Sequence, residues 1–173
     1  MNRFLRLLLV PLLLLLNGCL TLPVATTERP APEDVTVFAF NGRIAVKQGE
    51  TRYYAKLDWR HDETGDAIIL TTPLGQGVAE IVRDASGARL TLADRRRYEA
   101  ADWGALAQQI FGFHLPLAGS ERWLLGTTAV VDGWLLTVHQ RENDLPDGLP
   151  TLIELERDDI AVRLKIDDWS EVR

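Results

Sequence analysis

Few side chains in this sequence have the type and spacing needed for catalysis or metal binding. His61, His114 and His139 lie far apart with no ligand spacing, so each is expected to be a surface or turn residue. The serines lack a nucleophile elbow, and Gly119-Ser120-Glu121 is typical of a helix N-cap instead. We therefore expect no enzymatic activity, no metal and no cofactor.

Cys19 is the one residue whose position indicates a covalent modification. The first 18 residues begin with a basic segment and continue as an apolar run, which is the layout of an export signal. The run ends in Leu16-Asn17-Gly18-Cys19, which resembles a bacterial lipobox. We predict that residues 1–18 are a lipoprotein signal peptide and that Cys19 is lipidated. An ordinary signal peptide with an incidental buried cysteine is the alternative.

The mature chain begins with a tether. Leu20 follows the cysteine where an Asp would signal inner-membrane retention, which implies the outer membrane. Residues 19–34 contain three prolines and show no apolar periodicity, so they are expected to form a Pro-rich linker. Residues 35–173 then have a length that suits a single domain with its own core.

The mature chain is acidic. The whole sequence has 19 Lys and Arg against 25 Asp and Glu, and two of the arginines belong to the signal peptide. The formal net charge of the mature chain is therefore about −8. This balance argues against nucleic-acid binding and against attachment to anionic lipid through a basic patch.

Apolar and polar residues alternate through most of the domain, first in residues 38–46 and 53–59. Such alternation is typical of antiparallel strands with one face exposed to water. Helical spacing interrupts it at 102–111, where Asp102 is a plausible N-cap and Gly112 ends the helix. We predict an α+β fold, mainly antiparallel β, with about nine to eleven strands. The sheet either curls into an open (incomplete) β-barrel or stays flat against helices over a filled core.

The hairpin formed by residues 66–83 has an unusual apolar tip. Pro73 favours a tight turn and Gly75 supplies a permissive backbone. Leu74 is thereby held at a position where polar side chains are usual. The Leu74 side chain either folds back into the core or is exposed and contacts an apolar partner. Which of these holds decides the function.

Many apolar side chains are expected to face the interior of this one domain. Most should be core, and a subset would line an apolar cavity if the sheet curls without closing. The candidates are Phe38, Phe40, Ile44, Val46, Tyr53, Leu57, Trp59, Leu90, Leu92, Trp134, Leu136, Val138, Leu155, Leu164 and Ile166.

Five short motifs occur in the order seen in the LolB family of outer-membrane lipoprotein receptors, which this chain therefore resembles. They are Phe40-Asn41-Gly42-Arg43-Ile44-Ala45-Val46, Leu57-x-Trp59, Pro73-Leu74-Gly75, Trp123-Leu124-Leu125-Gly126 and Leu164-Lys165-Ile166-x-x-Trp169.

The resemblance implies an open antiparallel β-barrel with a helical lid over a hydrophobic cavity. It implies a protein that accepts lipoproteins from the periplasmic carrier LolA and inserts their acyl chains into the outer membrane. Pro73, Leu74 and Gly75 would form the membrane insertion loop of a lipid-anchored protein that faces the periplasm. We also expect the protein to be a monomer. Two departures, Ser120 and the short loop Thr127 to Asp132, concern the lid and one barrel edge.

Two other functions remain open. A periplasm-facing lipid carrier or scavenger would share the half-barrel but would not transfer its ligand to a membrane. A structural lipoprotein of the envelope would have a filled core and no saturable acyl site.

Overall fold

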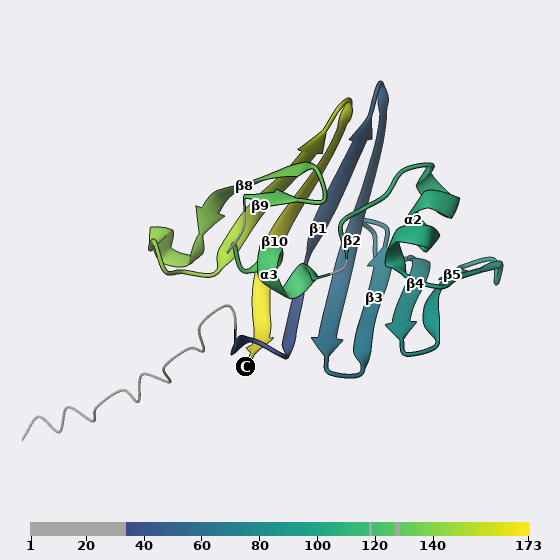
Figure 1. Ribbon diagram of the computed structural model, residues 1–173, viewed down its shortest axis with the longest axis horizontal. Coiled ribbons are helices and arrows are strands. Elements are labelled where there is room, and N and C mark those ends of the chain that lie inside the picture. Colours follow the sequence, from purple (N-terminus) through teal and green to yellow (C-terminus); the bar gives the residue numbers. More distant parts are fainter. Residues whose placement is uncertain (1–33, 118, 127–128) are drawn as a thin grey trace, which may run out of the picture.

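One antiparallel sheet dominates the fold (Figure 1). The computed structural model describes residues 34–117, 119–126 and 129–173. The predicted signal peptide, Cys19 and the linker up to residue 33 therefore lie outside the described residues. The strands are β1 (Phe38–Gln48), β2 (Thr51–Asp62), β3 (Gly65–Thr71), β4 (Gly77–Asp84), β5 (Gly87–Leu92), β6 (Arg97–Ala100), β7 (Val130–Val131), β8 (Trp134–Arg141), β9 (Pro150–Arg157) and β10 (Ile160–Val172).

The ten strands form an open sheet in the order β6-β5-β4-β3-β2-β1-β10-β9-β8-β7. Every pairing is antiparallel, and the first and last strands of the chain's domain, β1 and β10, lie side by side at its centre. Within the described residues β6 and β7 are the two edges and do not pair with each other. The expectation of one large, mainly antiparallel sheet is confirmed, and the open strand order is consistent with an incomplete barrel.

The helices lie on one face of the sheet (Figure 1). Helix α2 (Trp103–Phe111) follows β6 and packs on β5 and β6. Asp102 caps it, because its carboxylate accepts the backbone N–H of Ala105 at 2.8 Å, and Gly112 ends it in the left-handed region. The short helix α3 (Ser120–Leu124) lies over the middle of the sheet, and the 3-10 turn η2 (Glu142–Asp144) follows β8.

Alternation along each strand sets the two faces. In β1, Phe38 and Phe40 are buried while Asn41 and Arg43 are exposed. The buried face is rich in aromatic rings, and Trp59 of β2 meets Trp123 of α3 with ring centroids 6.3 Å apart. This helix-covered face is called the inner face below, and the opposite one the outer face.

Each of the five tryptophans donates its indole N–H, so burial leaves none of these groups unsatisfied. One of the bonds lies within the 113–125 segment, and another attaches that segment to β8. Trp123 donates to the carbonyl of Pro116 at 2.6 Å, and Trp134 donates to the carbonyl of His114 at 3.2 Å. The 113–125 segment is therefore held by directional bonds as well as by apolar packing.

Several elements differ from the sequence expectation. Ser120 does not cap α3: Gly119 holds the N-cap position and Ser120 is the first helical residue, with its side chain buried. The loop predicted from Thr127 to Asp132 contains the short strand β7, while residues 127 and 128 lie outside the described part of the chain. The sequence predicts a last strand at residues 160–166, but β10 runs on to Val172, because it pairs with β1 along its whole length.

Gly42→Ala is expected to destabilise the centre of the sheet. A Cβ atom at Gly42 would lie 2.3 Å from the backbone carbonyl oxygen of Lys165, so β1 and β10 would have to separate. We expect the free energy of unfolding to fall by about 1–3 kcal/mol, as for other overpacked sites. Urea denaturation followed by tryptophan fluorescence measures it. Gly77→Ala is the matched control, because a Cβ there meets nothing within 4 Å; equal losses in both variants would contradict the steric explanation.

Candidate lipid-contact site and insertion loop

The β3–β4 turn presents Leu74 to solvent. Its side chain is 91% exposed, so the alternative in which Leu74 folds back into the core does not hold. The backbone N–H of Gly75 donates to the carbonyl of Thr72 at 2.9 Å, which places Pro73 and Leu74 at the two central positions of a β-turn. Gly75 adopts a φ of +86°, a conformation that a residue with a side chain rarely takes.

Thr72 stiffens the same turn. Its backbone N–H donates to the carbonyl of Gln76 at 2.8 Å, and its hydroxyl accepts the backbone N–H of Gln76 at 3.1 Å. The proline ring fixes a further torsion angle. An apolar side chain on a stiff, solvent-exposed turn loses little conformational entropy when it enters an apolar phase.

The base of the same hairpin is held by a buried carboxylate that the sequence reading did not identify. Asp66 of β3 is buried, and its Oδ1 accepts the indole N–H of Trp59 at 3.0 Å. Its Oδ2 accepts Nε of Arg83 at 2.6 Å and the indole N–H of Trp103 at 3.4 Å. Because Trp103 is the first residue of α2, the carboxylate connects the hairpin to that helix.

His61 completes this group. Its Nδ1 lies 2.8 Å from Oδ1 of Asp66, its ring stacks on Phe38 at 4.8 Å, and its side chain is only 12% exposed. The expectation that His61 is a surface or turn residue is therefore wrong: β2 extends to Asp62, so His61 belongs to the strand. We call Asp66, Trp59, His61, Arg83 and Trp103 the Asp66 cluster.

The Asp66 cluster keeps its carboxylate ionised. Burial by itself would raise the pKa of Asp66, but hydrogen bonds from His61, Trp59 and Arg83 outweigh it and hold the pKa below the usual value. Each oxygen has at least two donors, so the cluster stabilises the charge as a hydrogen-bonded network. Its chemistry is that of a structural anchor, and the described residues bring no three potential metal ligands together.

An apolar pocket lies between α2 and the sheet, at the end of the hairpin that carries Leu74. Its volume is about 190 Å³. Leu70 and Val78 line it just before and just after the β3–β4 turn. The other lining residues come from β4, β5, α2 and the segment after it: Ala79, Ile81, Leu90, Leu92, Trp103, Leu106, Ala107, Ile110, Phe111 and Leu117.

The volume of this pocket limits the size of the ligand that it can hold unless the protein changes conformation. A cavity of about 150 Å³ accommodates one benzene ring, and this one is only slightly larger at about 190 Å³. It has room for a short apolar segment. A set of full-length acyl chains needs more space, which α2 would have to provide by moving away from β5 and β6.

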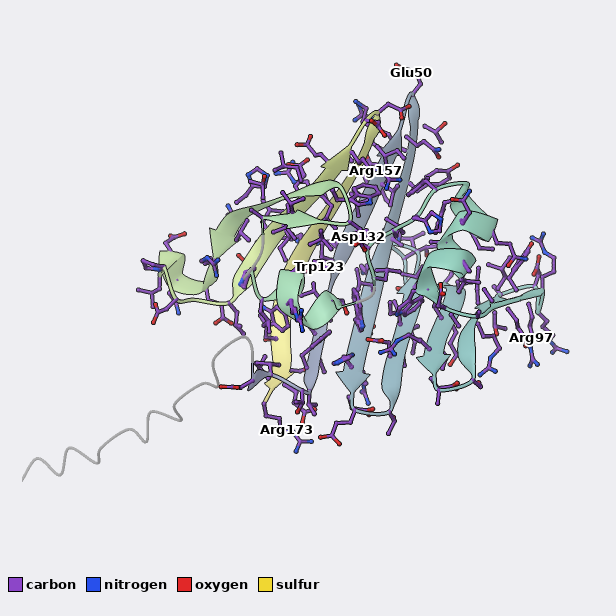
Figure 2. The ribbon with its side chains drawn as sticks, in the orientation of Figure 1. Glu50, Arg97, Trp123, Asp132, Arg157 and Arg173 are labelled. Atoms are coloured by element: carbon purple, nitrogen blue, oxygen red, sulfur yellow. The ribbon has the colours of Figure 1, made fainter. Side chains whose placement is uncertain are left out.

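A larger hollow of about 1140 Å³ opens between α3, the start of α2 and the β2–β3 turn. Charged and polar residues such as Arg83, Asp102 and His114 line much of it, and so do Asp132 and Arg157, labelled in Figure 2. An acyl chain placed there would remove water from these groups without replacing its hydrogen bonds. The smaller pocket is therefore the better apolar site, although the polar hollow is several times its volume.

The residues proposed from sequence to line a cavity are mostly core. Those buried in the inner-face cluster are Phe38, Phe40, Leu57, Trp59, Leu90, Trp134, Leu136, Leu155, Leu164 and Ile166, and those partly buried against it are Ile44, Val46, Leu92 and Val138. Among the described residues, only Leu90 and Leu92 of this set line the apolar pocket.

Tyr53 does not have the expected inward position. Its side chain is 58% exposed, because it lies near the β1–β2 turn, which projects beyond the helices. Glu50 marks this projecting turn at the top of Figure 2. Conversely, Leu106, Ala107 and Ile110 line the pocket although the sequence reading assigned them only to a helix face. In the sequence, the helical spacing of these residues beside the predicted hairpin was the observation that could have placed them at the pocket.

These features define a class of protein: an open antiparallel sheet with an apolar pocket under a helix and an exposed leucine on a stiff turn beside it. None of the helices in the described part of the chain is long and apolar enough to cross a membrane. The family model for outer membrane lipoprotein LolB matches residues 36–169. The chain belongs to the LolB family of outer-membrane lipoproteins.

Individual relatives support the same assignment. An outer-membrane lipoprotein LolB of Nitrosomonas europaea is 33% identical over 91% of this chain and 89% of its own length. That of Azoarcus sp. strain BH72 is 30% identical, covering 90% of this chain and 89% of the relative. That of Chromobacterium violaceum is 31% identical, covering 95% and 98%. None of these descriptions names a reaction, and family membership connects the chain with lipoprotein transport at the outer membrane.

Proposed function

We propose that this protein accepts lipoproteins from the carrier LolA and inserts their acyl chains into the outer membrane. The apolar pocket under α2 would receive the chains, and Leu74 would enter the bilayer surface. Lipidated Cys19 would anchor the molecule, and the Pro-rich linker would hold the domain in the periplasm. The observation that carries the proposal is the 91% exposure of Leu74 on a turn whose flanking residues line an apolar pocket.

The thermodynamics of acyl chains favours direct transfer. Each CH₂ group exposed to water costs about 0.8 kcal/mol, so several chains cost tens of kcal/mol. A free lipoprotein in the periplasm is therefore strongly disfavoured, and the ligand must pass from one apolar site to the next. Direction then comes from relative affinity, with the receptor binding more tightly than the carrier and the membrane more tightly than the receptor.

Helix α2 is the element that would open. The most extensive contacts of α2 are with β5 and β6, at one edge of the sheet. Trp103, the first residue of α2, donates its indole N–H to Asp66 of β3. Its far end carries Phe111, which is 41% exposed. The helix can therefore swing outward from its C-terminal end while the Asp66 cluster holds its N-terminal end, which widens the pocket on the side of Val78 and Leu74.

The test is transfer of a lipoprotein from its LolA complex to a soluble Cys19→Ala form of this protein, without nucleotide and without membrane. We expect the lipoprotein to move to this protein. Ala107→Phe should lower the transferred fraction roughly tenfold, because the ring fills the pocket, in which Ala107 is a buried lining residue. Gln109→Phe is the matched control, since residue 109 is on the exposed side of the same helix.

The other outcomes assign a different function. A folded protein that binds a fluorescent acyl probe but takes no lipoprotein from LolA would be a lipid carrier or scavenger. A folded protein with no saturable acyl site would be a structural lipoprotein. Transfer by Ala107→Phe at the wild-type rate would show that the chains bind outside the pocket under α2.

A further inference from the structure

The outer face of the sheet carries a group of cations. Lys165 of β10, Arg43 of β1 and Lys56 of β2 are register neighbours in one cross-strand row. Arg163 lies two residues before Lys165 on β10, so its side chain is on the same face. All four line a hollow of about 490 Å³ on the face opposite α2 and α3. They are called the outer-face basic cluster.

The floor of this hollow is apolar and continues into the β3–β4 turn. Ala45, Tyr54 and Leu152 line it together with Pro73. Pro73 directly precedes Leu74, so the hollow and the exposed leucine are parts of one surface. Tyr54 is itself 64% exposed, which adds an amphipathic ring of the kind found at membrane interfaces.

The positive charge of the cluster is largely uncompensated. Arg43 pairs with Asp167 at 2.7 Å, and Lys165 donates to the neutral amide of Gln140. No carboxylate of the described residues is within ion-pair distance of Lys56 or Arg163, and none lines the hollow.

The acidic residue opposite Arg163 on the neighbouring strand does not pair with it. Glu154 is the register partner of Arg163, but it lies 2.7 Å from His139 instead. The net negative charge of the whole chain argued against a basic patch. The residues beside the β3–β4 turn nevertheless carry a local excess of positive charge.

We propose that this hollow binds the headgroups of anionic phospholipids while Leu74 enters the bilayer. Cations around an apolar floor are complementary to a phosphate attached to acyl chains. Each Lys or Arg close to an anionic surface strengthens attachment about fivefold. The contact would keep the outer face toward the membrane and leave α2 and the inner face accessible to the carrier. This inference rests on the proposed function, in which the β3–β4 turn meets a membrane.

The test is co-flotation of the soluble Cys19→Ala protein with vesicles of phosphatidylcholine alone or with one third phosphatidylglycerol. We expect binding to the anionic vesicles to be at least tenfold tighter and to weaken sharply from about 0.05 to about 0.5 M salt. Lys56→Gln combined with Arg163→Gln should lower it roughly 25-fold. Arg95→Gln combined with Arg97→Gln is the matched control, because these exposed arginines lie at the β6 edge of the sheet, where Figure 2 labels Arg97.

Three results would overturn the inference. One is equal binding to neutral and anionic vesicles, and another is an equal loss in both double variants. The third is binding of inorganic phosphate at the hollow without any binding of vesicles, which would identify a site for free anions. Transfer from LolA in the absence of membrane should be unchanged in Lys56→Gln/Arg163→Gln, so failure of the receptor function is measured separately.

Discussion

Leu74→Glu is expected to reduce insertion of lipoproteins into outer-membrane vesicles by roughly tenfold to a hundredfold. Burial of a leucine side chain in an apolar phase is worth about 1.5–3 kcal/mol, and the carboxylate adds the cost of placing a charge in the bilayer. The fold should not change, because the Leu74 side chain is 91% exposed and makes no core contact to lose. Acyl binding and uptake from LolA should also remain.

The measurement is the amount of lipoprotein that reaches vesicles after uptake from LolA, compared with the thermal unfolding midpoint of the same variant. Gln76→Glu is the matched control: it adds the same charge to the same turn but leaves the leucine in place. If Leu74→Glu inserts at the wild-type rate, Leu74 is not the membrane contact. If Gln76→Glu is equally defective, charge near the membrane and not the apolar tip is responsible.

Asp66→Ala is expected to lower the free energy of unfolding by about 3–5 kcal/mol. The change removes the buried carboxylate that pairs with the partly exposed Arg83, and it leaves the indole N–H groups of Trp59 and Trp103 without their acceptor. Asp66→Asn should cost less, because an amide oxygen can still accept from Trp59. Chemical denaturation measures both, and Asp94→Asn, which breaks an exposed Asp–Arg pair, should change little.

The same carboxylate gives stability a defined pH dependence. Because the folded pKa of Asp66 lies below its unfolded value of about 3.9, its contribution is fully present above that pH. It is lost as the pH falls through the lower, folded pKa. Wild-type protein should therefore lose more stability on acidification than Asp66→Asn. Parallel curves for the two proteins would mean that Asp66 is not the group responsible.

The sequence determined most of the secondary structure. Alternation in β1 and β2 and the clean capping of α2 by Asp102 and Gly112 were legible, because strand and helix periods are local properties. The hairpin from Asp66 to Arg83 was also predicted, and in the structure these two end residues are register partners. Pro73 restricts the backbone of its turn and Gly75 permits the left-handed conformation that the turn needs, so Leu74 could be placed at a tip before any fold was known.

Only the tertiary structure decided the contacts between distant elements. Asp66, Arg83 and Trp103 form one cluster because antiparallel pairing and the return of α2 bring them together, and no local pattern encodes that approach. The same holds for the pocket: alternation could mark Leu57 or Trp134 as inward, but whether a residue lines a space or fills it depends on what packs opposite. Likewise, Lys56, Arg43 and Lys165 become neighbours only through strand register, which is why an acidic chain contains a basic hollow.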